Sequence, residues 1–332
     1  MNLEMIIRMV DRDHYVLTED GNPLTQSTAT RAILKSLQLL EVKPGDRVLE
    51  IGTGSGYSTA LIAQLVGEKG HVVSLDIDPI ITERAQQRLM EDNIENATLI
   101  TRDGREGHTE TAPFDRIIAW ATADHLPKQW IDQLKNSGII VAPFMLVPLA
   151  QSMAIARLRK YDKKIVGEQL IQGAYICMNE TPDYASLGPE LRADVVLHEK
   201  QKVGAWASSQ WMKQVPLDQR RQWMMQLQNS AILKCPLKGG ENYDAFRAFL
   251  LVKQPTELTT IYFAPMGMIG VSTSTSYALL SEERTCLQNG TLTLNDYLEE
   301  WRSIGHPGMD NLKPIVRQIN SVSVVQAAFK ID

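Results

Sequence analysis

The segment from Val48 to Tyr57, which reads VLEIGTGSGY, constrains the fold of this 332-residue chain more than any other segment. An apolar run that ends in alternating glycines and resumes as a helical pattern predicts a buried strand, a tight loop and a helix. Glycine lets the backbone turn sharply and lets a ligand approach where a Cβ atom would collide. The amide end of the following helix favours a negatively charged group, so the loop predicts a ligand site.

Short apolar runs alternate with helical patterns throughout the first half of the chain. The predicted strands cover residues 47–51, 71–77, 97–102, 114–119 and 139–144, and the predicted helices cover residues 28–40, 58–66, 79–92 and 126–134. Strands that alternate with helices need crossover connections, which place the strands parallel and the helices on both faces of the sheet. The sequence therefore predicts a Rossmann-like α/β domain.

Acidic side chains end two further predicted strands. Asp76 closes the second strand, 20 residues after Gly56, and Asp103 with Gly104 closes the third. Open α/β sheets bind ligands at these strand ends, where a carboxylate can accept hydrogen bonds from ribose hydroxyls. Asp103 beside a flexible glycine suits an adenine amino group. Glu50, before the glycines, is expected either to order the loop or to meet a ligand ammonium group through a water.

A dinucleotide-dependent enzyme is the main alternative for such a fold. Its fingerprint needs the spacing GxGxxG, and counting from Gly52 the third glycine position falls on Tyr57. No Walker-type sequence is present either, so the loop favours S-adenosylmethionine. The predicted cofactor site consists of Glu50, Gly52, Thr53, Gly54, Ser55, Gly56, Asp76, Ile77, Asp103 and Gly104.

The composition changes to Asn, Pro, Asp, Ser and Gly around residues 179–189, which predicts a domain boundary. Residues 1–180 are expected to form the cofactor domain, with an N-terminal arm and substrate loop in residues 1–40. Residues 185–332 are expected to form an α+β accessory domain. Its predicted helices cover 219–227 and 295–304, its predicted strands cover 245–253, 259–263 and 268–272, and a last strand begins at 315–323. The basic stretch from Arg157 to Lys164 is expected to be a solvated turn.

Charge and cysteine content narrow the function classes. The net charge is -5 with a pI near 5.8 and no basic stripe, which argues against nucleic-acid binding. The three cysteines form no CxxC pair and the histidines form no HExxH pattern, so no metal site is expected. The sequence shows neither a secretory signal nor a run of about 18 apolar residues, so we expect a cytoplasmic protein without membrane contact.

Several of these motifs together resemble the protein-L-isoaspartate (D-aspartate) O-methyltransferase family. VLEIGTGSGYSTALIAQLVGEKGHVVSLDID, at residues 48–78, is similar to the family's glycine motif and ribose acid, and residues 100–143 resemble its later motifs. The similarity covers roughly residues 8–180. It implies a Rossmann-like class I methyltransferase sheet, S-adenosyl-L-methionine as cofactor and S-adenosyl-L-homocysteine as product. It also implies a peptide or protein substrate that contains aspartate or isoaspartate.

The same resemblance implies substrate-facing residues. DRDHYV, at residues 11–16, is similar to the family's N-terminal arm, which helps to enclose the substrate. The implied substrate contacts are His14, Tyr15, Val16 and Tyr57. The family's TISQP-like segment places a serine near the transferred methyl group, and that position falls here on Thr28, with Ser27 beside it and Thr30 at the proline position. Thr28 or Ser27 is therefore expected to orient the substrate carboxylate.

The altered loop and the long C-terminal region favour one branch of the family. Members with such an extension include enzymes that tailor ribosomally made peptides, in which an aspartyl methyl ester closes to a succinimide (aspartimide). We expect such tailoring in preference to repair of isoaspartyl residues. A small-molecule or nucleic-acid methyltransferase is a weaker alternative, because AWATAD at residues 119–124 stands where an amino-methylating enzyme carries an NPPY-like tetrapeptide. A non-catalytic cofactor-binding protein is the third class.

Overall fold

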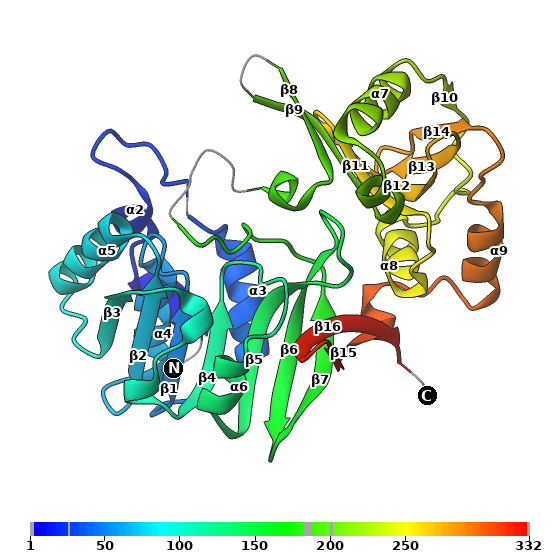
Figure 1. Cartoon of the computed structure of the whole chain (residues 1–332). Helices are drawn as coiled ribbons and strands as arrows, with labels where there is room; N and C mark the ends of the chain where they lie inside the picture. The colour runs from blue at the N-terminus through cyan, green and yellow to red at the C-terminus, as the bar shows by residue number, and fades with distance from the viewer. Residues whose placement is uncertain (1–2, 26, 182–187, 200–201, 331–332) are drawn as a thin grey trace.

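A seven-stranded sheet organises the first half of the chain in the computed structural model, which describes residues 3–25, 27–181, 188–199 and 202–330 (Figure 1). Its strands are β1 (Arg47–Ile51), β2 (His71–Asp76), β3 (Ala97–Thr101), β4 (Phe114–Ala119), β5 (Leu134–Met145), β6 (Met153–Tyr161) and β7 (Lys164–Ile171). The order is β3-β2-β1-β4-β5-β6-β7, with β1 to β5 parallel and β6 and β7 antiparallel. The predicted Rossmann-like sheet is confirmed, and its strand order reverses between β1 and β4.

Successive residues of the strands point to opposite faces, so each face has its own cover. Val48 and Val72 face α3 (Thr30–Leu40), α4 (Tyr57–Val66) and α5 (Pro79–Glu91), and α1 (Leu3–Met9) and α2 (Arg12–Val16) pack outside α4. Leu49 and Val73 face the other side, where α6 (Lys128–Gln133) and the C-terminal strands pack. Among the described residues, no helix has the length and apolar character needed to cross a membrane.

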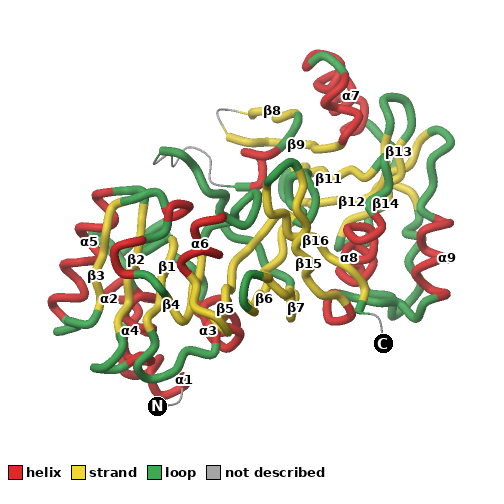
Figure 2. The backbone as a smooth tube through the Cα atoms, turned by 60° about the horizontal axis from the view of Figure 1, so that its bottom comes forward, coloured by secondary structure: helices red, strands yellow, loops and turns green. Residues whose placement is uncertain are grey.

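A second seven-stranded sheet, antiparallel throughout, follows in the order β10-β14-β13-β12-β11-β9-β8. Its strands are β8 (Val195–Glu199), β9 (Lys202–Ser209), β10 (Ile232–Leu233), β11 (Leu258–Phe263), β12 (Met266–Ser272), β13 (Tyr277–Ser281) and β14 (Cys286–Asn289). Helix α7 (Leu217–Gln228) packs on one face, and α8 (Tyr243–Lys253) and α9 (Asn295–Ser303) pack on the other. In Figure 2 this unit lies at the end of the molecule opposite the N-terminal helices. The expected α+β character of the region is confirmed.

The strand predicted at residues 245–253 is wrong, because these residues belong to α8. The helix begins after Asn242, whose side chain accepts a hydrogen bond from the Ala245 N–H at 2.9 Å. Side-chain caps of this kind satisfy one of the free N–H groups of a first helical turn. Phe246, Phe249 and Leu250 are all buried between the second sheet and the C-terminal strands. So many consecutive apolar residues hide the helical period in the sequence.

The C-terminal hairpin returns to the first sheet. The strand predicted at residues 315–323 is instead divided by Asn320 and Ser321, whose φ angles of 49° and 67° turn the chain. The turn joins β15 (Leu312–Ile319) to β16 (Val322–Phe329), and both strands pack on β5 to β7. The Leu126 N–H donates to the Ser323 carbonyl at 2.8 Å. The last part of residues 185–332 therefore contributes to the core of the first sheet.

The basic stretch from Arg157 to Lys164 is mostly sheet, not the solvated turn expected from the sequence. It spans the end of β6 and the start of β7, and Arg157 is buried. The Arg157 guanidinium lies 2.9 Å from the Glu41 carboxylate and also pairs with Glu168. Carboxylate partners of this kind offset the cost of taking a cation out of water.

The loop between β5 and β6 joins the two sheets. The buried Thr260 hydroxyl donates to the Ala150 carbonyl at 2.7 Å, and the Lys213 ammonium donates to the Pro148 carbonyl at 3.1 Å. Arg247 donates to the Gln151 carbonyl, and burial lowers the pKa of its guanidinium. One apolar cluster continues from the first sheet through α8 and α9. The two sheets are therefore packed on a shared core.

Thr260→Val is expected to weaken this junction. Valine keeps the shape of threonine but leaves the Ala150 carbonyl without its donor, which costs about 1–3 kcal/mol of unfolding free energy. Urea denaturation measures the change. Thr275→Val is the matched control, since Thr275 is exposed, and it should alter stability by less than about 0.5 kcal/mol. Equal stability of Thr260→Val and the wild type would contradict the importance of this bond.

Candidate active site

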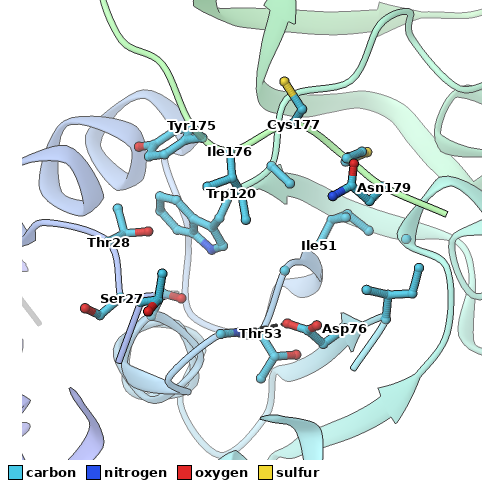
Figure 3. A pocket seen from close by; sticks show the side chains of 18 of the residues that line it. Ser27, Thr28, Ile51, Thr53, Asp76, Trp120, Tyr175, Ile176, Cys177 and Asn179 are labelled. Atoms are coloured by element: carbon cyan, nitrogen blue, oxygen red, sulfur yellow. Dashed lines mark hydrogen bonds between the residues drawn. The ribbon is translucent and has the colours of Figure 1, made fainter. Parts of the chain in front are cut away.

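A cavity of about 480 Å³ opens at the carboxyl edge of the first sheet (Figure 3). It lies beside the point where the strand order reverses, which is where open α/β sheets bind their ligands. Its wall includes eight of the predicted cofactor residues and both predicted catalytic residues: Gly52, Thr53, Gly54, Ser55, Asp76, Ile77, Asp103, Gly104, Ser27 and Thr28. The fold thus brings together segments that are far apart in the sequence.

Glu50 lies behind the glycine loop and outside the cavity wall. Its buried carboxylate accepts hydrogen bonds from the hydroxyls of Ser58 at 2.5 Å, Ser74 at 2.7 Å and Thr59, and from the Trp120 indole at 2.7 Å. Burial raises the pKa of Glu50, and these hydrogen bonds oppose the rise. Of the two roles expected for Glu50, this position fits the ordering of the loop.

Two glycines show why the loop needs residues without a Cβ atom. Gly52 has a φ of 90°, and its N–H donates to the Leu75 carbonyl at 2.7 Å as the chain leaves β1. Gly56 has a φ of 85° at the start of α4, where a Cβ atom would lie 3.0 Å from that of Ala85. Gly56 therefore allows α4 to pack against α5. It lies outside the cavity wall, in contrast to the expected cofactor contact.

Asp76 serves both the loop and the cavity. Its carboxylate accepts hydrogen bonds from the Gly54 N–H at 2.9 Å and the Asp78 N–H at 3.1 Å. Burial raises the pKa of Asp76, while the backbone hydrogen bonds oppose the rise. A carboxylate has about four lone-pair positions, so Asp76 can still accept hydrogen bonds from the hydroxyls of a ligand.

Asp103 has a basic partner, Arg105, that was not predicted from the sequence. Its carboxylate accepts hydrogen bonds from the Arg105 guanidinium at 2.6 and 2.9 Å and from the Arg105 N–H at 2.9 Å. Although burial favours the neutral acid, this pairing lowers the pKa of Asp103. An adenine amino group would therefore share the carboxylate with Arg105.

The two predicted catalytic hydroxyls differ in their surroundings. The Ser27 hydroxyl donates to the Leu24 carbonyl at 2.6 Å and so belongs to its own turn. The Thr28 carbonyl accepts a hydrogen bond from Arg12 at 3.5 Å, while its hydroxyl makes no hydrogen bond to a described residue. Figure 3 shows the Thr28 side chain beside Trp120. Thr28 is therefore the better placed of the two to meet a substrate.

The four implied substrate contacts of the arm and helix α4 lie outside the cavity wall. Tyr15, Val16 and Tyr57 are buried in the apolar cluster around α4. The Tyr15 hydroxyl donates to the Asp92 carboxylate at 2.6 Å, and burial together with this acid raises the pKa of Tyr15. His14 Nε2 lies 3.4 Å from a carboxylate at the end of α5. The arm side chains are held inside the fold because α2 packs against α4 and α5.

One wall of the cavity was not predicted from the sequence. The segment after β7, residues 174–179, forms this wall, and Trp120 lines the cavity directly after β4. The Tyr175 hydroxyl is hydrogen-bonded to that of Ser36 at 3.1 Å. Burial raises the pKa of Cys177 to about 11, so its thiol is protonated at neutral pH. These residues carry no periodic pattern, and only the aromatic content of the two short segments could have pointed to them.

The charge of the cavity wall fits an adenosyl sulfonium ligand. Asp76 and Asp103 line it, and no Lys, Arg or His side chain does so in the part of the chain that the structure describes. The Asp76 carboxylate forms no ion pair with a described residue, so it suits the hydroxyls and the positive charges of such a ligand. No group of three or more His, Cys, Asp or Glu side chains that could hold a metal ion occurs among the described residues.

A Rossmann-like sheet with a glycine loop and acidic strand ends around one cavity defines a class I methyltransferase that uses S-adenosylmethionine. The profile of the family described as protein-L-isoaspartate(D-aspartate) O-methyltransferase matches residues 7–182, slightly over half of the chain. The chain belongs to this family.

Individual relatives agree with this assignment. The protein-L-isoaspartate O-methyltransferase of Fervidobacterium nodosum is 43% identical over 141 residues, which are 42% of this chain and 69% of that protein. That of Ignicoccus hospitalis is 35% identical over 153 residues, 46% of this chain and 72% of that protein. A solved structure named protein-L-isoaspartate O-methyltransferase aligns with 99% of this chain and 95% of its own chain. The TM-score is 0.51 and the sequence identity is 18%, which shows a similar fold.

Gly104→Ala is expected to damage the cavity. A Cβ atom at Gly104 would overlap the Cγ2 methyl of Ile51, a cavity-lining side chain that β-branching keeps stiff. Affinity for S-adenosylhomocysteine, measured by calorimetry, should fall about tenfold or more, the equivalent of about 1.4 kcal/mol. Gly239→Ala is the control, because a Cβ atom there meets no atom within 4 Å. Unchanged affinity of Gly104→Ala would show that the ligand does not depend on this wall.

Proposed function

We propose that the protein methylates the carboxylate of an isoaspartyl residue in a peptide or protein. The observation that carries this proposal is the shared cavity of Thr28, the glycine loop and Asp76. A hydroxyl able to orient a carboxylate thus faces the cofactor half of the same cavity. Family membership supports the same class of substrate.

The cofactor half is proposed to hold S-adenosylmethionine through groups with different tasks. Asp76 accepts hydrogen bonds from the ribose hydroxyls, Asp103 receives the adenine amino group, and the segment from Gly52 to Ser55 lies along the methionine end. When bound, S-adenosylmethionine supplies a methyl group that its positive sulfur has already activated. The protein therefore needs to bind, orient and exclude water, and it needs no nucleophile of its own.

The substrate half is proposed to act by orientation. A carboxylate has a reference pKa near about 4, so it is ionised at neutral pH and needs no general base. The Thr28 hydroxyl donates to one carboxylate oxygen and leaves the other free to react, while Ser27 holds the turn. Orientation of two reacting groups is worth about 7–11 kcal/mol in favourable cases. The neighbouring backbone nitrogen then displaces methanol from the ester, which gives a succinimide without a further protein group.

Repair of isoaspartyl residues is the form of this activity that we favour. The altered loop and the long C-terminal region of the sequence had favoured peptide tailoring. A solved structure named protein-L-isoaspartate O-methyltransferase aligns with 99% of this chain. A long C-terminal region therefore also occurs in a protein that carries the name of the repair enzyme. Thr28, at the position of the family's serine, also lines the cavity, so the altered loop keeps a hydroxyl there. Tailoring of an aspartyl peptide is the competing outcome, and a cytoplasmic location stays a prediction.

The deciding experiment offers methyl-labelled S-adenosylmethionine with two peptides that differ only in isoaspartate or aspartate at one position. We expect label transfer to the isoaspartyl peptide alone, followed by release of labelled methanol. Transfer to the aspartyl peptide alone would favour tailoring. Transfer to neither peptide, with cofactor binding intact, would contradict the proposed function. Asp76→Ala is the control protein, because a chain that binds the cofactor more weakly should label the peptides less at a limiting cofactor concentration.

Thr28→Ala and Asp76→Ala should separate turnover from cofactor binding. Loss of the Thr28 hydroxyl removes one hydrogen bond to the reacting carboxylate, so kcat should fall about tenfold or more while the Kd for S-adenosylhomocysteine stays within about twofold. Asp76→Ala should weaken that Kd about tenfold or more, because two ribose hydrogen bonds are lost. Thr28→Ser retains a hydroxyl and should recover most of the turnover. Equal losses of kcat and affinity in Thr28→Ala would contradict its orienting role.

A further inference from the structure

Trp120 lines the cavity, yet the methyl transfer described above gives it no task. It follows β4 directly, and its N–H donates to the Ile51 carbonyl at 2.9 Å, which extends the parallel pairing of β4 with β1. The side chain therefore lies beside Gly52, at the point where the strand order reverses. Open α/β sheets bind their ligands at this point.

The Trp120 indole is held from two sides. Its Nε1 donates to the Glu50 carboxylate at 2.7 Å, and the Tyr175 ring meets it edge to face with the ring centroids 5.8 Å apart. Tyr175 is itself fixed by the hydrogen bond between its hydroxyl and that of Ser36. Because its only polar atom is engaged by Glu50, the indole presents aromatic surface to the cavity.

The surroundings of Trp120 favour a positively charged ligand group. The acids Asp76 and Asp103 line the same cavity, and no basic side chain lines it among the described residues. Figure 3 shows the indole between Thr28 on one side and Ile51 on the other. Trp120 thus lines the cavity that the cofactor half shares with the hydroxyl that is proposed to orient the substrate. The methyl group is transferred between these two halves.

We propose that Trp120 is a specificity-determining residue that favours the positively charged sulfonium of S-adenosylmethionine over the neutral thioether of S-adenosylhomocysteine. An aromatic face attracts a cation within about 6 Å of its centre, most strongly where water is excluded, and tryptophan does so best. The neutral product gains no such attraction, so the same side chain helps cofactor to displace product. This inference rests on the cofactor site assigned under the proposed function.

The test compares Trp120→Phe with Trp120→Leu. Both variants remove the N–H that donates to Glu50, but only phenylalanine keeps an aromatic face. Calorimetry without peptide measures the Kd of S-adenosylmethionine and of S-adenosylhomocysteine for each protein. We expect Trp120→Phe to keep the ratio of the two Kd values within about threefold of the wild type. Trp120→Leu should reduce the preference for S-adenosylmethionine about 5- to 30-fold, mainly through weaker binding of that ligand.

Trp206→Leu is the matched control, because it removes a similarly buried indole from β9, outside the cavity wall. It should leave the ratio unchanged. If Trp120→Leu does not fold, Trp120→Met replaces it as a long side chain without an aromatic face. Equal weakening of both ligands in the phenylalanine and leucine variants would overturn the proposal, since loss of the Glu50 hydrogen bond would then explain both.

The design separates this inference from the proposed function. A wild-type protein that binds neither adenosyl compound would overturn both, because the cavity would not be a cofactor site. A protein that shows the expected ratios but labels no isoaspartyl peptide would lose only the proposed substrate. The ratio of Kd values is also insensitive to a general loss of stability, which would weaken both ligands alike.

Discussion

The buried carboxylate of Glu50 is the interaction on which the rest of the site depends. It ties the end of β1 to Ser74 of β2, to the first turn of α4 and to Trp120 after β4. A buried acid is costly unless its oxygens are hydrogen-bonded, and here four donors converge on it. The path of the glycine loop, and with it the position of Asp76 relative to the cavity, follows from this cluster. Of the two roles expected for Glu50, the ordering of the loop is therefore the one that these contacts fit.

The parts of the structure that the sequence predicted well are local. The strand at 47–51, its glycine loop and the helix after it follow from a short pattern of apolar residues and glycines, and β1 and β4 have the predicted bounds. Strand ends of a parallel sheet meet at one edge, so Asp76 and Asp103 were expected to converge. The wall formed by Trp120 and Tyr175 depends on packing between distant segments. The strand prediction for residues 245–253 was wrong because apolar residues are so frequent in α8 that the helical period is not visible in the sequence.

The two halves of the cavity are built in different ways. The cofactor half is made largely of the glycine loop and the strand ends that carry Asp76 and Asp103. The substrate half comes from the turn that carries Thr28 and from the segment after β7, whose side chains set its chemistry. Tyr15 of the N-terminal arm and Tyr57 of α4 are not part of either half; both are buried in the apolar cluster around α4.

The return of β15 and β16 to the first sheet makes the timing of synthesis part of the folding problem. Residues 312–329 cover strands that end at Ile171, so the ribosome releases that apolar surface long before it makes the cover. At about 5–20 residues per second, the delay is on the order of ten seconds. Contacts of such long sequence separation also slow folding, because the loop must close before they form. During synthesis, the apolar face of the first sheet therefore stays partly exposed until β15 and β16 have been made.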